Sequence, residues 1–427
     1  MYPQVLFKNR KPDRIATIDE YRESGGYRAL EKVLKSDSHT EIQQNLEEAM
    51  LLGRGGAAFP SAKKLKSVRD DAPFPRYIVC NADEMEPGTF KDRVLIHADP
   101  HLLIEGIILG AYSILAENGI IFIRPEYENA ARILEREINV ARNAGFLGKN
   151  ILGTDYSFDL VVHRSGGRYI CGEVTAQVNA LQGKRPNPKQ PPPYATEKGL
   201  WGQPTLLSNV ETFACIPPII QNGADWFRNL ALTETAAGTK LFCVSGKVNR
   251  PGCYELPLGI KLSEIIEVHA GGMKNGVKFK ACLPGGASTH FMPEKYYHQE
   301  MDFESLKIKG FRLGTAAIMV FDHSVCMVGA TLNLTEFFAR ESCGWCTPCR
   351  EGFPYLKDIL WRIEHGKGEE EYIPLMKDMC KQLWNSYCAF APGGVGPIES
   401  LLAYFEEEVM QHITEKGCPF KSGKTGM

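Results

Sequence analysis

The chain has 427 residues, 44% of them hydrophobic and 23% charged, which is ordinary globular usage and excludes a disordered or fibrous protein. The 49 basic and 51 acidic residues give a formal net charge of −2, so we expect no nucleic-acid partner. The start of the chain is polar, and the longest apolar stretch, 102–116, is too short to cross a bilayer. We therefore expect neither a signal sequence nor membrane insertion.

The first block of the chain, residues 1–238, alternates helical and strand patterns, which predicts an α/β domain. Apolar residues recur at helical spacing in the segments 18–34, 41–52, 100–116 and 129–144. Short apolar runs predict strands at 76–81, 119–124, 160–164 and 168–171. Residues 183–204 are rich in Pro, Gly, Lys and Gln and predict a long loop.

The rest of the chain predicts two further domains. Residues 239–326 are expected to form a small α+β unit, with strands at 241–245 and 277–281 and a helix at 262–269. Residues 327–427 are expected to be all-α. Apolar stripes at 332–339, 356–363, 375–383 and 401–413 predict a four-helix bundle, and the polar tail from Gly417 is expected to be loose.

Thirteen cysteines are the unusual feature of the composition. In the reducing, intracellular setting that we infer, clustered cysteines indicate metal or redox chemistry more often than disulfides. Cys343, Cys346 and Cys349 are separated by two residues each, a spacing that favours an iron–sulfur cluster over zinc. The ferredoxin pattern would place a fourth cysteine at position 353, which is Phe353 here, so the fourth ligand lies elsewhere.

Four cysteines are candidates for that ligand: Cys326, Cys380, Cys388 and Cys418. Cys388 begins a Gly- and Pro-rich segment, whose backbone amides can approach sulfur. The remaining cysteines lie singly in apolar context and are expected to pack in the core. They are Cys80, Cys171, Cys215, Cys243, Cys253 and Cys282.

Three loops in the first block suggest a cofactor site. Residues 53–60 read Gly-Arg-Gly-Gly-Ala-Ala-Phe-Pro, which indicates either an anion-binding loop or the end of a helix. Asp83, Glu84 and Glu86 follow a predicted strand, and three carboxylates in four residues fit beside a cation or a redox ring, or form a solvated acidic turn. A third loop lies at 165–173. Together with the cysteines, these loops suggest a redox cofactor that feeds a cluster.

These motifs resemble the NADH-binding flavoprotein subunit of bacterial respiratory complex I, which has relatives in NAD-linked hydrogenases and formate dehydrogenases. The resemblance rests on residues 53–60, 81–93, 168–173, 209–212 and 341–352 and covers nearly the whole chain. It implies an FMN- and NADH-binding α/β domain, a ubiquitin-like β-grasp (SLBB-like) domain, and a helical bundle with a [4Fe–4S] cluster. It also implies NADH dehydrogenase activity, in which FMN takes hydride from NADH and electrons pass singly to the cluster and on towards quinone.

The resemblance further implies partners and a location. The family works with a small thioredoxin-like [2Fe–2S] subunit and a large multi-cluster iron–sulfur subunit. The chain is therefore expected on the cytoplasmic side, in the peripheral arm of a membrane-bound complex.

Residue roles carry over by motif. Glu84 and Glu86 are expected to be catalytic, and Cys343, Cys346, Cys349 and Cys388 are expected to ligate the cluster. The expected cofactor-binding residues are Gly53, Arg54, Gly55, Gly56, Phe59, Lys64, Asn81, Asp83, Glu84, Tyr169, Gly172, Glu173, Tyr194 and Asn209.

The sequence departs from the family pattern mainly where the adenosine half of NADH would bind. Val174 replaces a glutamate associated with the ribose, Pro191 replaces a lysine, and Ser67 stands in place of an aromatic residue. Ala58 replaces a glycine of the flavin loop. Losing a ribose contact costs about 1–3 kcal/mol of binding free energy, so we hypothesise that the affinity for the dinucleotide, or the preference for NADH over NADPH, is changed. We give equal weight to the alternative that these substitutions are neutral and are compensated by other residues.

Two other functions stay open at this point. One is a related FMN and iron–sulfur subunit with altered or lost NADH use, fed by NADPH or another donor, in a hydrogenase, a formate dehydrogenase or a modified complex I. Val174 and Pro191 favour it. The other is a non-enzymatic β-grasp protein whose cysteines bind zinc, which the loops at 53–56 and 81–84 disfavour.

Overall fold

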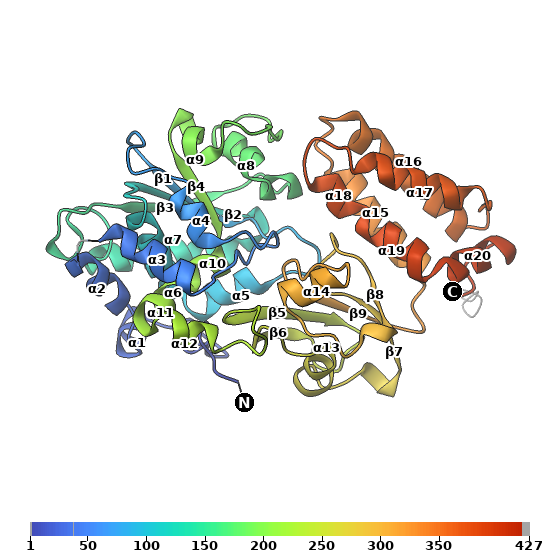
Figure 1. Ribbon diagram of the computed structural model, residues 1–427, viewed down its shortest axis with the longest axis horizontal. Helices are drawn as coiled ribbons and strands as arrows, with labels where there is room; N and C mark the ends of the chain where they lie inside the picture. Colours follow the sequence, from blue (N-terminus) through green and yellow to red (C-terminus); the bar gives the residue numbers. More distant parts are fainter. Residues whose placement is uncertain (1, 37, 421–427) are drawn as a thin grey trace.

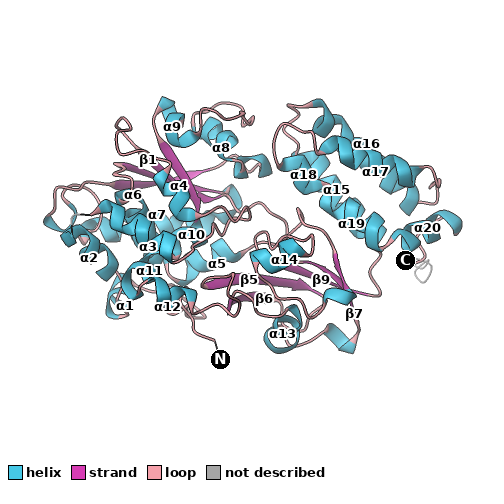
Figure 2. Ribbon diagram, viewed as in Figure 1, coloured by secondary structure: helices cyan, strands magenta, loops and turns pink. Residues whose placement is uncertain are grey.

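The computed structural model describes residues 2–36 and 38–420. Figure 1 shows three parts in chain order: an α/β part in blue to green, a second sheet in yellow, and a group of helices in orange to red. Figure 2 shows that strands occur only in the first two parts. The predicted order of α/β, α+β and all-α is confirmed.

The first part is built on a four-stranded parallel sheet with the order β3-β2-β1-β4. Its strands are β1 (Tyr77–Ala82), β2 (Asn118–Ile123), β3 (Asp159–Arg164) and β4 (Thr205–Asn209). Because all four run the same way, their carboxyl ends meet at one edge, where Asn81 of β1 pairs with Asn209 of β4. The segments that follow β1 and β4 therefore begin side by side.

Helices cover this sheet and bury its apolar residues. They are α1 (Ile18–Glu23), α2 (Arg28–Ser36), α3 (His39–Glu48), α4 (Ser61–Lys66), α5 (Lys91–Ala98), α6 (Pro100–Tyr112), α7 (Glu128–Asn143), α8 (Val174–Leu181), α9 (Ala195–Lys198), α10 (Val210–Ala214), α11 (Ile216–Asn222) and α12 (Ala224–Arg228). Every residue of α6 is buried. Gly106 lets α6 lie against α10, because a Cβ there would stand 2.1 Å from the carbonyl oxygen of Phe213.

Three predictions for this part are wrong. The helix predicted at 18–34 is two helices, because Gly25 has a φ of +100° and a Cβ on Gly26 would stand 2.2 Å from the ring of Tyr21. The strand predicted at 168–171 is a 3₁₀ helix, Tyr169–Gly172, because the Tyr169 N–H donates to Glu341 and not to a neighbouring strand. The loop predicted at 183–204 contains α9, and the strand β4 after it was missed.

The second part is a five-stranded mixed sheet with the order β6-β5-β9-β7-β8. The strands are β5 (Thr239–Gly246), β6 (Gly252–Pro257), β7 (Phe279–Leu283), β8 (Met292–Pro293) and β9 (Ala317–Asp322). The predicted strands at 241–245 and 277–281 correspond to β5 and β7, whereas β6, β8 and β9 were missed. The helices are α13 (Leu262–Glu264), which continues as a π turn over Ile265–His269, and α14 (Phe303–Ile308).

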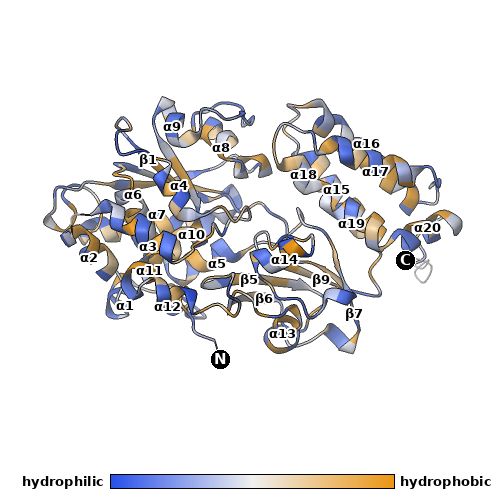
Figure 3. Cartoon of the chain, viewed as in Figure 1, coloured by the Kyte–Doolittle hydropathy of each residue, from blue (hydrophilic) through white to orange (hydrophobic). Residues whose placement is uncertain are grey.

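The third part is helical: α15 (Met327–Glu341), α16 (Thr347–Glu364), α17 (Tyr372–Leu383), α18 (Phe390–Gly394), α19 (Gly396–Tyr404) and α20 (Glu406–Thr414). In Figure 3 these helices carry both hydrophobic and hydrophilic residues, as helices do that bury one face. The helix predicted at 401–413 is two helices, because Phe405 leaves helical geometry with a φ of −135°. The Gly- and Pro-rich segment after Cys388 forms α18.

Two expectations concern membranes and the tail. Within the described residues, no single helix has the length and hydropathy needed to cross a membrane; α5 and α6 reach them only together, as a pair bent by 104°. The tail was expected to be loose from Gly417, but the Phe420 ring stacks on His412 at a centroid distance of 6.3 Å. Residues 421–427 lie outside the described residues.

Candidate functional site

A cavity of about 310 Å³ lies at the carboxyl ends of β1 and β4. All three parts of the chain line it, with Asn81 and Asn209 from the parallel sheet, Ser288 and Arg312 from the second part, and Phe390 from the helices. A cavity beyond the carboxyl ends of parallel strands is where α/β proteins commonly bind ligands.

One wall of this cavity is a buried network of charges. The Lys91 ammonium lies 2.6 Å from the Asp92 carboxylate and 3.1 Å from that of Glu211, and it donates to the Asn209 side chain. Asn209 in turn donates to Asp92 over 2.7 Å. Burial alone would lower the pKa of Lys91, but the neighbouring carboxylates of Asp92 and Glu211 raise it, so Lys91 stays charged. The network places an ion-paired ammonium, the Asp92 carboxylate and the Asn209 amide in the cavity wall.

The three carboxylates predicted after β1 all reach the cavity. Burial raises the pKa of Asp83 to about 6 and that of Glu84 to about 7, and it also raises the pKa of Glu86. Glu84 accepts the N–H groups of Asp92 and Arg93 at the start of α5 and the hydroxyl of Tyr127, so it also positions that helix. A solvated acidic turn is excluded, since Asp83 and Glu84 are both buried.

Glu86 joins the three parts of the chain. Its carboxylate accepts the Tyr169 hydroxyl over 2.6 Å and the backbone N–H of Ser288 over 2.6 Å. The ring of Tyr169 meets Phe337 of α15 and Phe390 of α18 edge-on, with centroids 5.3 and 5.5 Å away. The carboxylate is therefore held in one place by the second part and, through Tyr169, by the helices.

The structure brings ten of the predicted site residues into the cavity wall: Gly55, Gly56, Asn81, Asp83, Glu84, Glu86, Tyr169, Gly172, Glu173 and Asn209. The other five predicted site residues do not line the cavity: Gly53, Arg54, Phe59, Lys64 and Tyr194.

The five outlying residues have separate surroundings. Arg54 is buried and donates to the carbonyl oxygen of Ala237, while burial lowers the pKa of Lys64 to about 8. Phe59 and Tyr194 are 47% and 59% exposed. The Gly53 N–H donates to the Phe59 carbonyl and thereby closes the glycine-rich loop.

Three features of the cavity wall suit a polar ligand such as a flavin. The Oδ2 atom of Asp83 is buried and has no hydrogen-bond partner among the described residues, so it can accept a hydrogen bond from a ligand N–H or O–H. A Cβ added to Gly172 would meet no atom within 4 Å, so the lack of a side chain keeps that wall open. Lys91 adds a cation suited to the anionic parts of such a ligand.

Cys343, Cys346, Cys349 and Cys388 line a second, smaller pocket. Of the four candidates that the spacing left open, Cys388 is the one that lines this pocket. Zinc would hold sulfur atoms about 3.8 Å apart, given bonds of about 2.3 Å. Within residues 2–36 and 38–420, no three of these four sulfurs lie within 4.8 Å of one another. The sulfurs are therefore more widely spaced than zinc would hold them, which favours a cluster.

The six cysteines that were predicted to pack in the core are all buried, which confirms that prediction. They are Cys80, Cys171, Cys215, Cys243, Cys253 and Cys282. Sequence reasoning missed several residues of the large cavity: Met85, Thr89, Ser288, Thr289, Arg312, Thr315 and Phe390. The signal available for some of them was Pro284-Gly285-Gly286, a turn directly after a buried strand.

Comparison with known proteins agrees with this geometry. Family models match residues 46–218 (Nuo51 FMN-binding domain), residues 241–291 (SLBB domain) and residues 317–412 (NADH-ubiquinone oxidoreductase-F iron-sulfur binding region). The predicted FMN-binding, SLBB-like and iron–sulfur parts are thus confirmed.

Whole-length relatives match as well. The F subunit of NADH-quinone oxidoreductase from Escherichia coli (strain K12) is 48% identical over 394 residues, 92% of this chain and 88% of the relative. A second form of the F subunit, from Rhizobium meliloti (strain 1021), is 44% identical over 421 residues, 98% of this chain and 100% of the relative. A solved NAD⁺-reducing [NiFe]-hydrogenase in the H₂-reduced state has a TM-score of 0.83 and 32% identity, over 95% of this chain and 68% of that one. The chain belongs to the family of the F subunit of NADH-quinone oxidoreductase.

Proposed function

We propose that this chain is the electron-input subunit of a complex I, that it binds FMN and NADH in the large cavity, and that it carries a [4Fe–4S] cluster on Cys343, Cys346, Cys349 and Cys388. When bound, FMN accepts a hydride from NADH and releases the two electrons one at a time. The observation that carries the proposal is that Ile170 and Phe390 line both the cavity and the cysteine pocket. The two redox sites thus share walls.

The residues of the cavity have distinct tasks in this proposal. Gly55, Gly56 and Asn209 hold the flavin, and Lys91 supports its anionic part. Asp83 offers its unpartnered oxygen to a donor on the flavin. The ionised carboxylates disfavour added negative charge on a neighbouring ring, so they keep the reduction potential of the flavin low.

Glu86 and Glu173 face the nicotinamide side in the same proposal, and Glu84 acts both there and at the start of α5. Glu173 is held by its own helix, since its carboxylate accepts the Ala176 N–H over 2.8 Å. Five predicted residues act from outside the cavity wall. Gly53 and Arg54 shape the glycine-rich loop, and the path by which the dinucleotide enters is bordered by Phe59, Lys64 and Tyr194.

The domain limits, partners and location belong to the same proposal. Residues 1–238 form the FMN and NADH domain, residues 239–326 the SLBB domain and residues 327–427 the cluster domain. The small thioredoxin-like [2Fe–2S] subunit and the large multi-cluster subunit are the expected neighbours in a peripheral arm on the cytoplasmic side. The similarity to the F subunits of NADH-quinone oxidoreductases supports this assembly, and the similarity to the NAD⁺-reducing hydrogenase is compatible with the alternative of a hydrogenase-type donor without favouring it.

Anaerobic titration of the purified protein with NADH, NADPH and dithionite tests the proposal, with flavin and cluster absorbance followed together. We expect NADH to bleach the flavin and then the cluster. If dithionite reduces the flavin and the cluster but NADH does not, the proposed oxidation of NADH is wrong. If NADPH reduces them better than NADH, NADPH is the electron donor and the two proposed redox sites stay as they are.

A further inference from the structure

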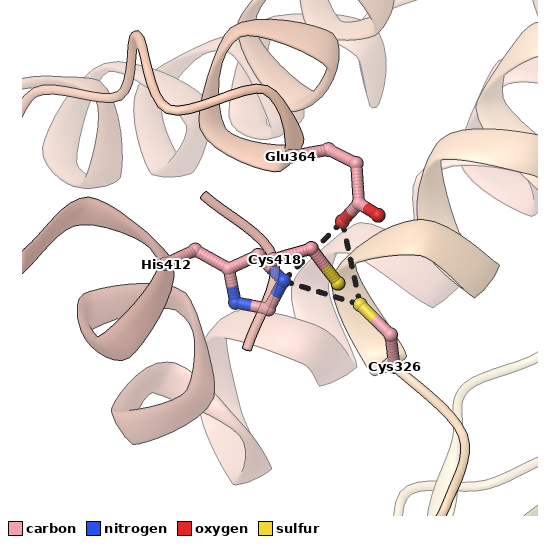
Figure 4. A group of neighbouring side chains, drawn as sticks. All are labelled: Cys326, Glu364, His412 and Cys418. Atoms are coloured by element: carbon pink, nitrogen blue, oxygen red, sulfur yellow. Dashed lines mark hydrogen bonds and ion pairs between the residues drawn. The ribbon is translucent and has the colours of Figure 1, made fainter. Parts of the chain in front are cut away.

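A second group of metal-type ligands lies in the helical part, away from both redox sites. Cys326, Glu364, His412 and Cys418 bring one ligand atom each to within 4.8 Å of one another. Figure 4 shows the four side chains converging from separate elements. Cys326 caps the start of α15, Glu364 ends α16, His412 lies on α20, and Cys418 follows that helix. We propose that these four residues bind one zinc ion that holds the end of the helical part together.

The three separations among the ligand atoms of Cys326, Glu364 and His412 are close to those around a tetrahedral ion, and the Cys418 sulfur lies within 4.8 Å of all three. Zinc bonds of about 2.0–2.3 Å place the corners of a tetrahedron about 3.3–3.8 Å apart. The Cys326 sulfur lies 3.3 Å from the Glu364 carboxylate and 3.2 Å from His412 Nε2, and Nε2 lies 3.3 Å from that carboxylate. A set of two sulfurs, one imidazole and one carboxylate suits zinc better than calcium or magnesium, which prefer oxygen ligands.

The outer contacts orient the ligands as they do around bound metals. His412 Nδ1 donates to the carbonyl oxygen of Glu408 over 2.7 Å, so the lone pair of Nε2 faces Cys326 and Glu364. The Gly329 N–H donates to the Cys326 sulfur over 3.1 Å, a hydrogen bond of the kind that orients sulfur ligands of metals. His412 is fully buried and Glu364 is 5% exposed, whereas Cys326 and Cys418 are half-buried.

The proposed ion would have a structural role. Four protein ligands leave no open position for a substrate, as in structural zinc sites. Cys346 directly precedes α16 and Glu364 is its last residue, so the 18 residues of this helix put about 27 Å between the cluster pocket and the zinc group. The ion is therefore not a step in the electron path. It fixes three helices and the segment after α20 at the end of the helical part that is remote from the cluster.

This end of the helical part also meets the second sheet. Lys280 of β7 forms an ion pair of 2.7 Å with Glu408 of α20, and its ammonium lies 4.9 Å above the ring of Phe420. Because Glu408 also accepts the His412 hydrogen bond and Phe420 follows Cys418, the zinc group would hold both contacts with Lys280 in place. The proposal does not depend on the proposed electron-input function.

Metal analysis of the full-length protein with its FMN and iron tests the proposal. We expect about one zinc per chain, with two sulfur and two nitrogen or oxygen neighbours in zinc X-ray absorption. Cys326→Ser/Cys418→Ser should lower zinc at least tenfold and leave FMN and iron unchanged. Cys380→Ser, which removes a buried cysteine of α17 outside the group, should keep the zinc.

A rescue pair guards against loss of zinc by misfolding. His412→Ala should lose the ion, whereas His412→Cys should retain it and raise the sulfur count at zinc from two to three. Wild-type protein without stoichiometric zinc would overturn the proposal, as would zinc that survives Cys326→Ser/Cys418→Ser. A Cys326–Cys418 disulfide in wild-type protein, seen by peptide mass spectrometry without reduction, would overturn it too. Loss of NADH-dependent flavin bleaching with zinc intact would instead contradict only the proposed electron-input function.

Discussion

The ring of Tyr169 lies edge-on against the ring of Phe390, with their centroids 5.5 Å apart. Tyr169 lines the large cavity and donates to Glu86, and Phe390 lines both the cavity and the cysteine pocket. This contact joins the 3₁₀ helix after β3 to the short helix after Cys388. The cofactor site and the cluster site are thus built as neighbours by packing alone, although Tyr169 and Cys388 are far apart in the chain.

The choice of Cys388 as the fourth cluster ligand predicts a specific loss. Cys388→Ala should abolish cluster reduction by dithionite and lower the iron content, because three thiolates remain in the pocket. FMN content and flavin bleaching by NADH should persist, since Cys388 does not line the large cavity. Iron and acid-labile sulfide analysis with low-temperature electron paramagnetic resonance measures the effect. Cys380→Ala is the matched control and should keep its cluster; a cluster that survives in Cys388→Ala but not in Cys380→Ala would reverse the assignment.

The raised pKa of Asp83 predicts how the stability of the FMN-free protein depends on pH. The pKa of about 6 in the folded state exceeds the value of about 3.9 in an unfolded chain, so the folded protein binds more protons between about pH 4 and 6. The free energy of unfolding should therefore fall as the pH rises through this window. Asp83→Asn should remove about 2–3 kcal/mol of that fall.

Urea unfolding of the FMN-free protein at several pH values between 4 and 8 measures this slope. Burial also raises the pKa of Glu84 and of Glu105 to about 7, so part of the slope should remain in Asp83→Asn. Asp155→Asn, at an exposed position, is the control and should match the wild type. Equal slopes in Asp83→Asn and wild type would show that Asp83 does not carry the buried charge.

Local patterns in the sequence were enough for features that depend on near neighbours. The spacing of Cys343, Cys346 and Cys349 predicted a cluster pocket, and the acidic residues after β1 do reach the cavity. The wrong predictions arose where distant contacts decide. The amide of Tyr169 bonds to Glu341 of α15, which no pattern within 168–171 could indicate. The same holds for β9, which pairs in parallel with β5 across more than 70 residues.

The candidate site was incomplete for the same reason. Ser288 and Arg312 reach the cavity because loops of the second part of the chain lie beside the carboxyl ends of β1 and β4. The backbone N–H of Ser288 carries no sequence signal, yet it is one of the two groups that hold Glu86. Among Cys326, Cys380, Cys388 and Cys418, only the fold separates the cysteine of the second pocket from the two that lie together with Glu364 and His412.

The backbone conformation of Ala58, in the glycine-rich loop at 53–60, predicts that its replacement by glycine stabilises the protein. Ala58 has a φ of +53°, in the left-handed region that disfavours a Cβ by about 1–2 kcal/mol. Ala58→Gly removes this strain but makes the unfolded chain more flexible, so we expect a net gain of about 0.5–1 kcal/mol in the free energy of unfolding. Ala57→Gly, at a position without a positive φ, should lower it instead. Urea unfolding compares the two, and a loss in both variants would show that the loop is not strained at Ala58.

The valine at the start of α8 predicts the choice of dinucleotide. Val174 is the first residue of that helix and directly follows Glu173, a cavity residue. In Val174→Glu the new carboxylate can accept hydrogen bonds from ribose hydroxyls and repel a 2′-phosphate, and an acidic residue is favourable in the first turn of a helix. We expect KM for NADH to fall about tenfold and use of NADPH to fall by at least as much.

Val174→Gln keeps a hydrogen-bonding group without the charge, so it should improve NADH use without rejecting NADPH. Steady-state kinetics with both donors and a soluble acceptor separates these effects. An NADH-to-NADPH preference that is the same in the wild type, in Val174→Gln and in Val174→Glu would mean that other residues have taken over recognition of the ribose.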